Sequence, residues 1–392
     1  MKIAVVNNFY PPRAGGSSHI SSSLAERFAR AGNEVCVITT QYKSAPAMEV
    51  LNGVTIYRVP SWTLPKSKIS YNFDITFGLK FGNYKKISKI LDEFDPDVIH
   101  QHGQFFDLTW QSGFWARKRN VKTVLTLHTR LASPVRIISF IFRQLDRFVV
   151  HPILILNKPN KVIAIDKEFI KYAEQRYGLL RRKDILEYIS IGVDLEQIEE
   201  SLLLYNRNED KQEIIASLGH VIPLRDRTDL VSALPLVVDK HPEVKVRVIG
   251  GVYNDDFLTL ARKLNVEANL QCIGAVQKKE VPKLLLESKM EIHDLQGFGV
   301  GIASLEAMAC GIPVIMSVDP EYFPHAKLID QKNYINVPLN DPVALAEAIN
   351  RFLDDPEFAV SIGAEGRRYV LDNFDMKNVA KEYLELFNRL IY

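Results

Sequence analysis

The chain has 392 residues, 47% of them hydrophobic and 24% charged, which is the composition of an ordinary soluble globular protein and more chain than one core usually holds. A formal net charge of +2 excludes a global field that would attract nucleic acid, and three cysteines without metal-like spacing argue against a disulfide framework. The first apolar run is too short for a signal peptide and no later run could span a bilayer, so we expect a cytoplasmic protein.

Short β-rich runs alternate with helical patterns along the first half of the chain. After the first run, at 2–8, a helical pattern places Ile20, Leu24 and Phe28 on one face and stops near Gly32. Further strands are expected at 34–40, 54–60, 97–102, 123–128 and 161–166. Strands separated by helices in this way indicate βαβ units and a mostly parallel sheet.

The alternation restarts after a charged, weakly periodic stretch. Five more strands are expected at 213–219, 244–251, 270–276, 290–296 and 312–317. We therefore predict an α/β chain of two doubly wound, Rossmann-like domains facing across a cleft, at 1–190 and 191–375. A last helix, 376–392, could pack on either domain, and we assign it to the first. Ligands of such sheets bind outside the carboxyl ends of the strands.

Gly15 and Gly16 lie where the first strand gives way to the first helix. Glycines there let backbone N–H groups approach a phosphate, and the helix N-terminus adds a favourable dipole. An ordinary glycine turn with serine capping is the alternative. The pair is not a G-x-G-x-x-G pattern and no acidic residue ends the second strand, so a nicotinamide cofactor is poorly supported.

Three histidines follow buried-type strands. His128 ends one of them, where an imidazole could donate to a substrate hydroxyl or a leaving phosphate. His100 and His102 share one face of the strand at 97–102, but no third ligand is evident, so we expect no metal site. A histidine satisfied at a strand–loop junction remains the alternative.

Two further loops could bind an anion. His220, Arg225 and Arg227 lie in or beside a loop that leads into a helix, where an arginine could neutralise a leaving pyrophosphate. A solvated loop with its own salt bridges explains them as well. A second loop, 297–301, contains three glycines and precedes the helix that carries Glu306. That carboxylate could accept hydrogen bonds from both hydroxyls of a ribose, or be only a surface charge near a helix N-terminus.

Together these segments resemble glycosyltransferase family 4, whose members are retaining enzymes of GT-B fold that use nucleotide sugars. The motifs that carry the resemblance are YPPRAGGSSH, TLHT, ISIGVDLEQI, GVGIASLEAMACGIPVI and the tail EGRRYVLDNFDMKNVAKEYLELF. The resemblance implies that 1–190 binds the acceptor and that 191–375 binds the nucleotide-sugar donor.

Roles for single residues follow from the resemblance. His128 would contact the transferred sugar, Glu306 would hold the ribose, and main-chain groups near Val276 would face the base. These two, His128 and Glu306, are the implied catalytic residues. The implied donor-binding set is Gly15, Gly16, His220, Arg225, Val276, Phe298, Gly299, Val300, Gly301 and Glu306.

The chain departs from the family at two places. Phe298 occupies the position of the first of two carboxylates spaced eight residues apart, and Asp294 or Gln296 could replace that carboxylate through a shifted loop. His220 and Arg225 replace an Arg/Lys pair, and a partly charged histidine would weaken pyrophosphate binding. These changes leave open a non-catalytic relative that binds nucleotide or glycan or supports a partner enzyme. A sugar-nucleotide 2-epimerase is a further alternative.

The implied reaction is retaining transfer from a UDP- or GDP-linked sugar to a hydroxyl of a glycan or lipid-linked acceptor, with no cofactor, no metal and no nucleic-acid partner. The segment 66–89 contains six lysines, five Tyr or Phe residues and one acid, Asp74, which suits an anionic membrane surface. The segment 135–150 is apolar with flanking arginines. Contact there would place the protein at the inner face of the cell membrane. A solvated basic edge and a core helix are the alternatives.

Overall fold

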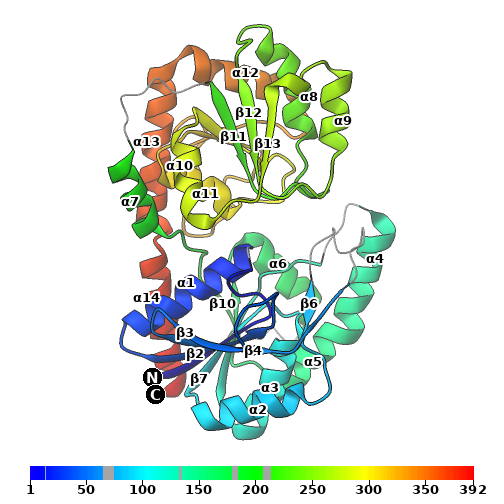
Figure 1. Ribbon diagram of the computed structural model, residues 1–392, viewed down its shortest axis with the longest axis vertical. Coiled ribbons are helices and arrows are strands. Elements are labelled where there is room, and N and C mark those ends of the chain that lie inside the picture. The colour runs from blue at the N-terminus through cyan, green and yellow to red at the C-terminus, as the bar shows by residue number, and fades with distance from the viewer. Residues whose placement is uncertain (14, 65–74, 132–134, 179–183, 206–212) are drawn as a thin grey trace. The chain divides into compact units, whose positions relative to one another are not determined.

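The computed structural model describes residues 1–13, 15–64, 75–131, 135–178, 184–205 and 213–392. The chain forms two compact units, one made of Met1–Gly192 together with Met376–Tyr392 and the other of Val193–Asp375 (Figure 1). Each unit contains its own mostly parallel sheet, so the predicted α/β class with two Rossmann-like sheets is confirmed.

In the described part of the first unit, one sheet has the strand order β10-β9-β8-β7-β1-β2-β4-β3. All neighbours in it are parallel except β3 and β4. Its strands are β1 (Lys2–Asn7), β2 (Glu34–Thr40), β3 (Met48–Leu51), β4 (Val54–Val59), β7 (Val98–His102), β8 (Lys122–Thr126), β9 (Lys161–Ala164) and β10 (Leu186–Tyr188). A separate antiparallel pair is formed by β5 (Trp62–Thr63) and β6 (Thr76–Phe77).

The helices of the first unit cover this sheet. They are α1 (Gly16–Arg30), α2 (Asn83–Phe94), α3 (Asp107–Arg119), α4 (Arg136–Leu145), the π-helical turn η1 (Asp146–Val150), α5 (His151–Asn157), α6 (Lys167–Arg176) and α14 (Met376–Ile391). As its spacing predicts, α1 buries Ile20, Leu24 and Phe28. The last helix, α14, packs against α1 (Figure 1). The ring centroids of Phe28 and Phe387 lie 5.5 Å apart between these two helices.

The second unit has a six-stranded parallel sheet in the order β13-β12-β11-β14-β15-β16. Its strands are β11 (Ile214–Leu218), β12 (Lys245–Ile249), β13 (Leu270–Gly274), β14 (Met290–Ile292), β15 (Val314–Met316) and β16 (Ile335–Asn336). Its helices are α7 (Leu195–Leu204), α8 (Thr228–Val238), α9 (Asp256–Lys263), η3 (Glu267–Asn269), η4 (Lys278–Glu280), α10 (Val281–Leu286), α11 (Ile302–Ala309), α12 (Pro342–Asp354) and α13 (Pro356–Asn373).

Each sheet has a point where its parallel strand order reverses, and these reversals locate the residues of interest. In the first unit the order reverses between β1 and β7, and in the second between β11 and β14. Open α/β sheets bind ligands at such a reversal, outside the carboxyl ends of the strands. In the first unit, Asn7, His102 and Thr126 are in register at this edge.

Candidate functional site

The start of α1 is open at the carboxyl edge of the first sheet. Gly15 has a φ of +151°, which L side chains rarely adopt, and a Cβ added to Gly15 or Gly16 would meet no described heavy atom within 4 Å. Within the described residues no side chain caps α1, and the hydroxyl of Ser18 instead donates to the carbonyl of Arg13 at 2.7 Å. The serine cap of the alternative explanation is therefore absent there. Uncapped N–H groups at a helix N-terminus are a favourable environment for a phosphate.

A pair of histidines lies at the same edge. His102, the last residue of β7, is fully buried, and its Nδ1 lies 2.8 Å from Nε2 of His128, which follows β8. Desolvation lowers the pKa of His128 to about 4, and burial lowers the pKa of His102 well below its ordinary value. Both rings are therefore neutral near pH 7, so each can offer a ligand hydrogen bonds but no charge.

His100 belongs to the core beneath α14. Its Nε2 lies 2.9 Å from Oγ1 of Thr126, which in turn lies 2.9 Å from the hydroxyl of Tyr383. Burial lowers the pKa of His100 to about 3, and its ring centroid lies 4.6 Å from that of Tyr383. In the part of the chain that the structure describes, no group of three His, Cys, Asp or Glu side chains is placed to hold a metal ion.

In the second unit, His220 follows β11 as a neutral hydrogen-bonding group. Its Nδ1 accepts a hydrogen bond from the backbone N–H of Gly251 at 2.9 Å, and burial lowers its pKa. Since Nδ1 is an acceptor, the neutral ring carries its proton on Nε2. His220 is therefore less charged near neutral pH than the sequence alone suggests.

The two arginines of the next loop have different surroundings. Arg227 is buried and donates to the carbonyl oxygens of Arg225, Asp226 and Gly219 at 2.9, 3.2 and 3.3 Å, so it supports the loop from inside. Arg225 has a side chain that is 41% exposed, with its Nε 4.0 Å from Oδ1 of Asp294. Of the two, Arg225 is the one that an anion can reach.

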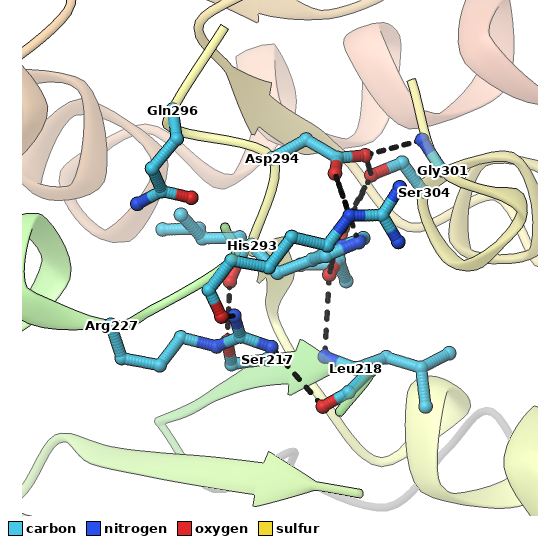
Figure 2. A network of polar contacts seen from close by, with 12 residues as sticks. Ser217, Leu218, Arg227, His293, Asp294, Gln296, Gly301 and Ser304 are labelled. Atoms are coloured by element: carbon cyan, nitrogen blue, oxygen red, sulfur yellow. Dashed lines mark hydrogen bonds and ion pairs between the residues drawn. The ribbon is translucent and has the colours of Figure 1, made fainter. Parts of the chain in front are cut away.

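The side chain of Asp294 contacts the N-terminus of α11. Its Oδ2 accepts from the N–H of Gly301 at 2.6 Å and from the hydroxyl of Ser304 at 3.1 Å, while Oδ1 lies 3.2 Å from Nε2 of His293 (Figure 2). Burial alone raises the pKa of Asp294, but the charges of His293 and Arg225 and these hydrogen bonds outweigh it and lower the pKa.

This arrangement corrects two expectations for the glycine-rich loop. The N–H of Gly301 is used by Asp294, so it is not open to a donor phosphate as the sequence suggested, and Asp294 is not open to sugar hydroxyls. Gly299 also has a packing role, because its φ is +103° and an added Cβ would lie 2.1 Å from the ring of Tyr322. Phe298 is exposed in this loop and the adjacent Val300 is buried.

Gln296, the other candidate replacement for the missing carboxylate, lies against the arginine loop. Its Nε2 is 3.4 Å from the carbonyl oxygen of Asp226 and 3.5 Å from Oδ1 of the same residue. The glycine-rich loop and the arginine loop are thus connected within the second unit.

Glu306 is a buried carboxylate in α11, with 6% of its surface exposed. It is therefore not the surface charge of the alternative explanation. It accepts a hydrogen bond from Nζ of Lys278, a residue of η4 that the sequence reasoning missed. The sequence could have indicated Lys278, because it lies two residues after Val276, which ends a predicted strand. This ion pair connects the segment after Val276 with α11.

The comparisons with known proteins agree across both units. The family profile "Glycosyltransferase Family 4" matches residues 14–197, and the profile "Glycosyl transferases group 1" matches residues 205–369. The chain belongs to glycosyltransferase family 4. The two matched ranges include Gly15, His128, Arg225 and Glu306.

This glycosyltransferase is 25% identical over 398 residues to an uncharacterized glycosyltransferase of Methanocaldococcus jannaschii, covering 99% of this chain and 98% of the relative. It is 22% identical over 403 residues to the phosphatidylinositol N-acetylglucosaminyltransferase GPI3 subunit of Saccharomyces cerevisiae, and the match covers 99% of this chain and 83% of that relative. The solved structure of Anabaena HepE in complex with UDP and glucose matches at a TM-score of 0.73 and 16% identity, covering 99% of each chain. The GT-B fold is therefore confirmed.

Proposed function

We propose that this glycosyltransferase transfers a sugar from a UDP- or GDP-linked donor to an acceptor hydroxyl, with retention and without a metal ion. The observation that carries the proposal is Glu306, a buried carboxylate beyond the carboxyl edge of the second sheet. A carboxylate has about four acceptor positions. With one taken by Lys278, the others can accept both hydroxyls of a ribose. The donor domain is accordingly 191–375 and the acceptor domain 1–190.

The other residues act on the sugar and the phosphates. In the second unit, the guanidinium of Arg225 and Nε2–H of His220 stabilise the charge that develops on the leaving diphosphate. In the first unit, the N–H groups near Gly15 and Gly16 are a favourable environment for a phosphate. His128 donates to a hydroxyl of the transferred sugar. The bond from the anomeric carbon to the phosphate oxygen breaks, the acceptor oxygen attacks from the same face, and its proton passes to the leaving phosphate. Positioning and charge stabilisation supply the rate enhancement.

Thermal stability in the presence of nucleotides tests the donor site. We expect one of UDP, GDP or ADP, or its sugar conjugate, to raise the melting temperature of the wild type but not of Glu306→Ala. Glu347→Ala is the matched control, because Glu347 is an exposed glutamate of the same unit. A wild type that no nucleotide stabilises would contradict the proposal.

A non-catalytic member of the family is the second candidate. The exposed Phe298, where the family pattern places its first carboxylate, favours this alternative, as does the neutral His220. Such a protein would be stabilised by a nucleotide but would leave the sugar donor intact in the presence of every acceptor. Formation of an epimer without acceptor would instead indicate an epimerase.

We further propose that the acceptor is linked to a lipid, as the name of the yeast relative would suggest for that protein. Residues 66–74 of the basic segment 66–89 lie outside the described residues. The segment 135–150 is described, and α4 buries none of its residues, so it is not a core helix. Phe140 and Phe148 are 59% and 66% exposed.

The charges of this segment suit an anionic membrane surface. Arg136, Arg143 and Arg147 are exposed, whereas the one acid of the segment, Asp146, is buried and accepts hydrogen bonds from two tyrosine hydroxyls. Exposed aromatic and basic side chains without exposed acids bind headgroups and the acyl boundary together. Within the described ranges, no helix combines the length and apolar character that crossing a membrane requires. Contact would therefore be peripheral.

Vesicle co-sedimentation tests this surface, which is defined by residues 135–150. We expect binding to vesicles that contain phosphatidylserine, weaker binding to phosphatidylcholine alone, and loss of binding in the double variant Phe140→Ser, Phe148→Ser. Leu204→Ser is the control, since Leu204 is 88% exposed on α7 of the other unit. Equal binding by the double variant and the control would contradict the proposal.

A further inference from the structure

The hydrogen bond between His102 and His128 can be protonated in two ways. In the first, Nδ1–H of His102 donates to Nε2 of His128, and the single proton of His128 lies on its Nδ1. In the second, Nε2–H of His128 donates to Nδ1 of His102, and the proton of His102 lies on its Nε2. The two arrangements give Nδ1 of His128 opposite roles toward a ligand: it is a donor N–H in the first and an acceptor in the second.

The geometry shows that the two rings meet edge to edge. Their planes differ by 10° and their centroids lie 5.0 Å apart, farther than the 2.8 Å between the two nitrogens. The nitrogens therefore lie between the rings, close to both ring planes, as an N–H donor and a ring lone pair require. The backbone holds this geometry, because His102 pairs in register with Thr126 of β8.

The buried Nε2 of His102 distinguishes the two arrangements. In the part of the chain that the structure describes, this atom has no hydrogen-bond partner. The first arrangement leaves an unpaired lone pair there, whereas the second leaves an unpaired N–H. Among buried backbone groups, orphaned N–H groups are rarer than under-satisfied carbonyl oxygens, and we apply the same preference to the ring nitrogens. The first arrangement is therefore favoured.

A doubly protonated His102 is disfavoured as well. Burial makes protonation of His102 harder, and a proton on either neighbouring histidine, His100 or His128, would oppose it further. Nε2 of His100 is already engaged with Thr126, and the ring centroids of His100 and His102 lie 4.2 Å apart at 45°. A positive charge on His102 would thus have no counter-ion among these neighbours.

We propose that His102 is a positioning residue that donates from Nδ1 and so holds His128 as the tautomer with its proton on Nδ1. The inference rests on the proposed role of His128 at the transferred sugar. It makes His128 a hydrogen-bond donor to a sugar hydroxyl oxygen and keeps its Nε2 from accepting a proton. A buried histidine that the reaction itself does not use thereby acquires a function.

Nitrogen-15 NMR of histidine-labelled protein tests the inference without any activity, because protonated and unprotonated ring nitrogens have well-separated shifts. In the wild type we expect a proton on Nδ1 of His128 and none on Nε2. His102→Leu should release this preference, and His102→Asn, whose amide can donate near the same place, should restore it. His100→Asn, on the same face of β7 and equally buried, is the control and should leave His128 unchanged.

Binding measurements separate positioning from a purely structural role. We expect His102→Leu to weaken the binding of the sugar nucleotide about tenfold and to leave the binding of the nucleotide alone unchanged. His102→Asn should recover most of the lost affinity for the sugar nucleotide. A wild-type His128 protonated on Nε2, or the same tautomer in His102→Leu as in the wild type, would overturn the inference. If the wild type binds no nucleotide, the proposed function fails, and the NMR result still decides the pairing.

Discussion

Replacing Asp294 by asparagine should destabilise the second unit, because this carboxylate has charged or polar partners on both oxygens. The amide oxygen could still accept from Gly301 and Ser304. The amide nitrogen would then face Nε2 of His293 and Nε of Arg225, where the second carboxylate oxygen now lies at 3.2 and 4.0 Å. The contacts of a carboxylate oxygen with these nitrogens would thus be replaced by contacts between hydrogen-bond donors.

The magnitude follows from burial and charge. A hydrogen bond to a charged group contributes about 1.5–3 kcal/mol, and breaking one partner of a buried ion pair costs about 3–5 kcal/mol. Asp294 is buried, but the side chain of Arg225 is 41% exposed, so its share is screened. We therefore expect a loss of about 3 kcal/mol. With a urea slope of about 2 kcal/mol per molar, the midpoint should fall by about 1.5 M.

Urea denaturation at several pH values is the assay, with Asp239→Asn as a control at an exposed aspartate of the same unit. The pKa of Asp294 is lower in the folded chain than its ordinary value of about 3.9. Its stabilisation is therefore complete above about pH 4 and is lost as the pH falls through the folded pKa. Wild type and Asp294→Asn should differ at pH 7 and converge below pH 4. A midpoint within about 0.3 M of wild type would refute the reasoning.

Three further outcomes are expected. Gly299→Ala should lower the free energy of unfolding in urea by about 3 kcal/mol, because the added Cβ would lie 2.1 Å from Tyr322 at a φ of +103°. Gly15→Ala should lower it by about 1–2 kcal/mol, from backbone strain alone. Equal losses in the two variants would contradict this. Glu306→Gln should weaken binding of the cognate nucleotide on the order of a hundredfold by calorimetry, yet leave its 2′,3′-dideoxy form unaffected. NMR titration should give His220 a pKa below about 6.5, so nucleotide affinity should stay level between pH 8 and 7; a rise on acidification would oppose this.

The strands and the family were predictable because their signals are local. Every predicted strand formed, since each is a short apolar run bounded by turn residues. Among the described strands, five were missed. The edge strand β3 is mostly exposed, and β10 has three half-buried residues in a charged stretch. The other three, β5, β6 and β16, have only two residues each, so none of the five contains a buried apolar run. Edge position, which tertiary structure sets, removes the pattern on which such a prediction depends.

The surroundings of individual side chains were less predictable. Arg225 and Arg227 are two residues apart and look alike in the sequence, yet the structure buries Arg227 and exposes the side chain of Arg225. The bond between Asp294 and Gly301 depends on a loop turning back on itself, and Lys278 reaches Glu306 across 28 residues. Sequence spacing within a helix or strand does not encode such contacts.

The most direct test of the central claim is transfer itself. The purified protein would be incubated with the sugar nucleotide that stabilises it and with vesicles of membrane lipid extract, and the product would be followed by NMR of the anomeric proton. The proposed function predicts release of nucleoside diphosphate matched by a new sugar–lipid bond of unchanged anomeric configuration, both lost in Glu306→Gln. An intact donor, or a product of inverted configuration, would contradict it.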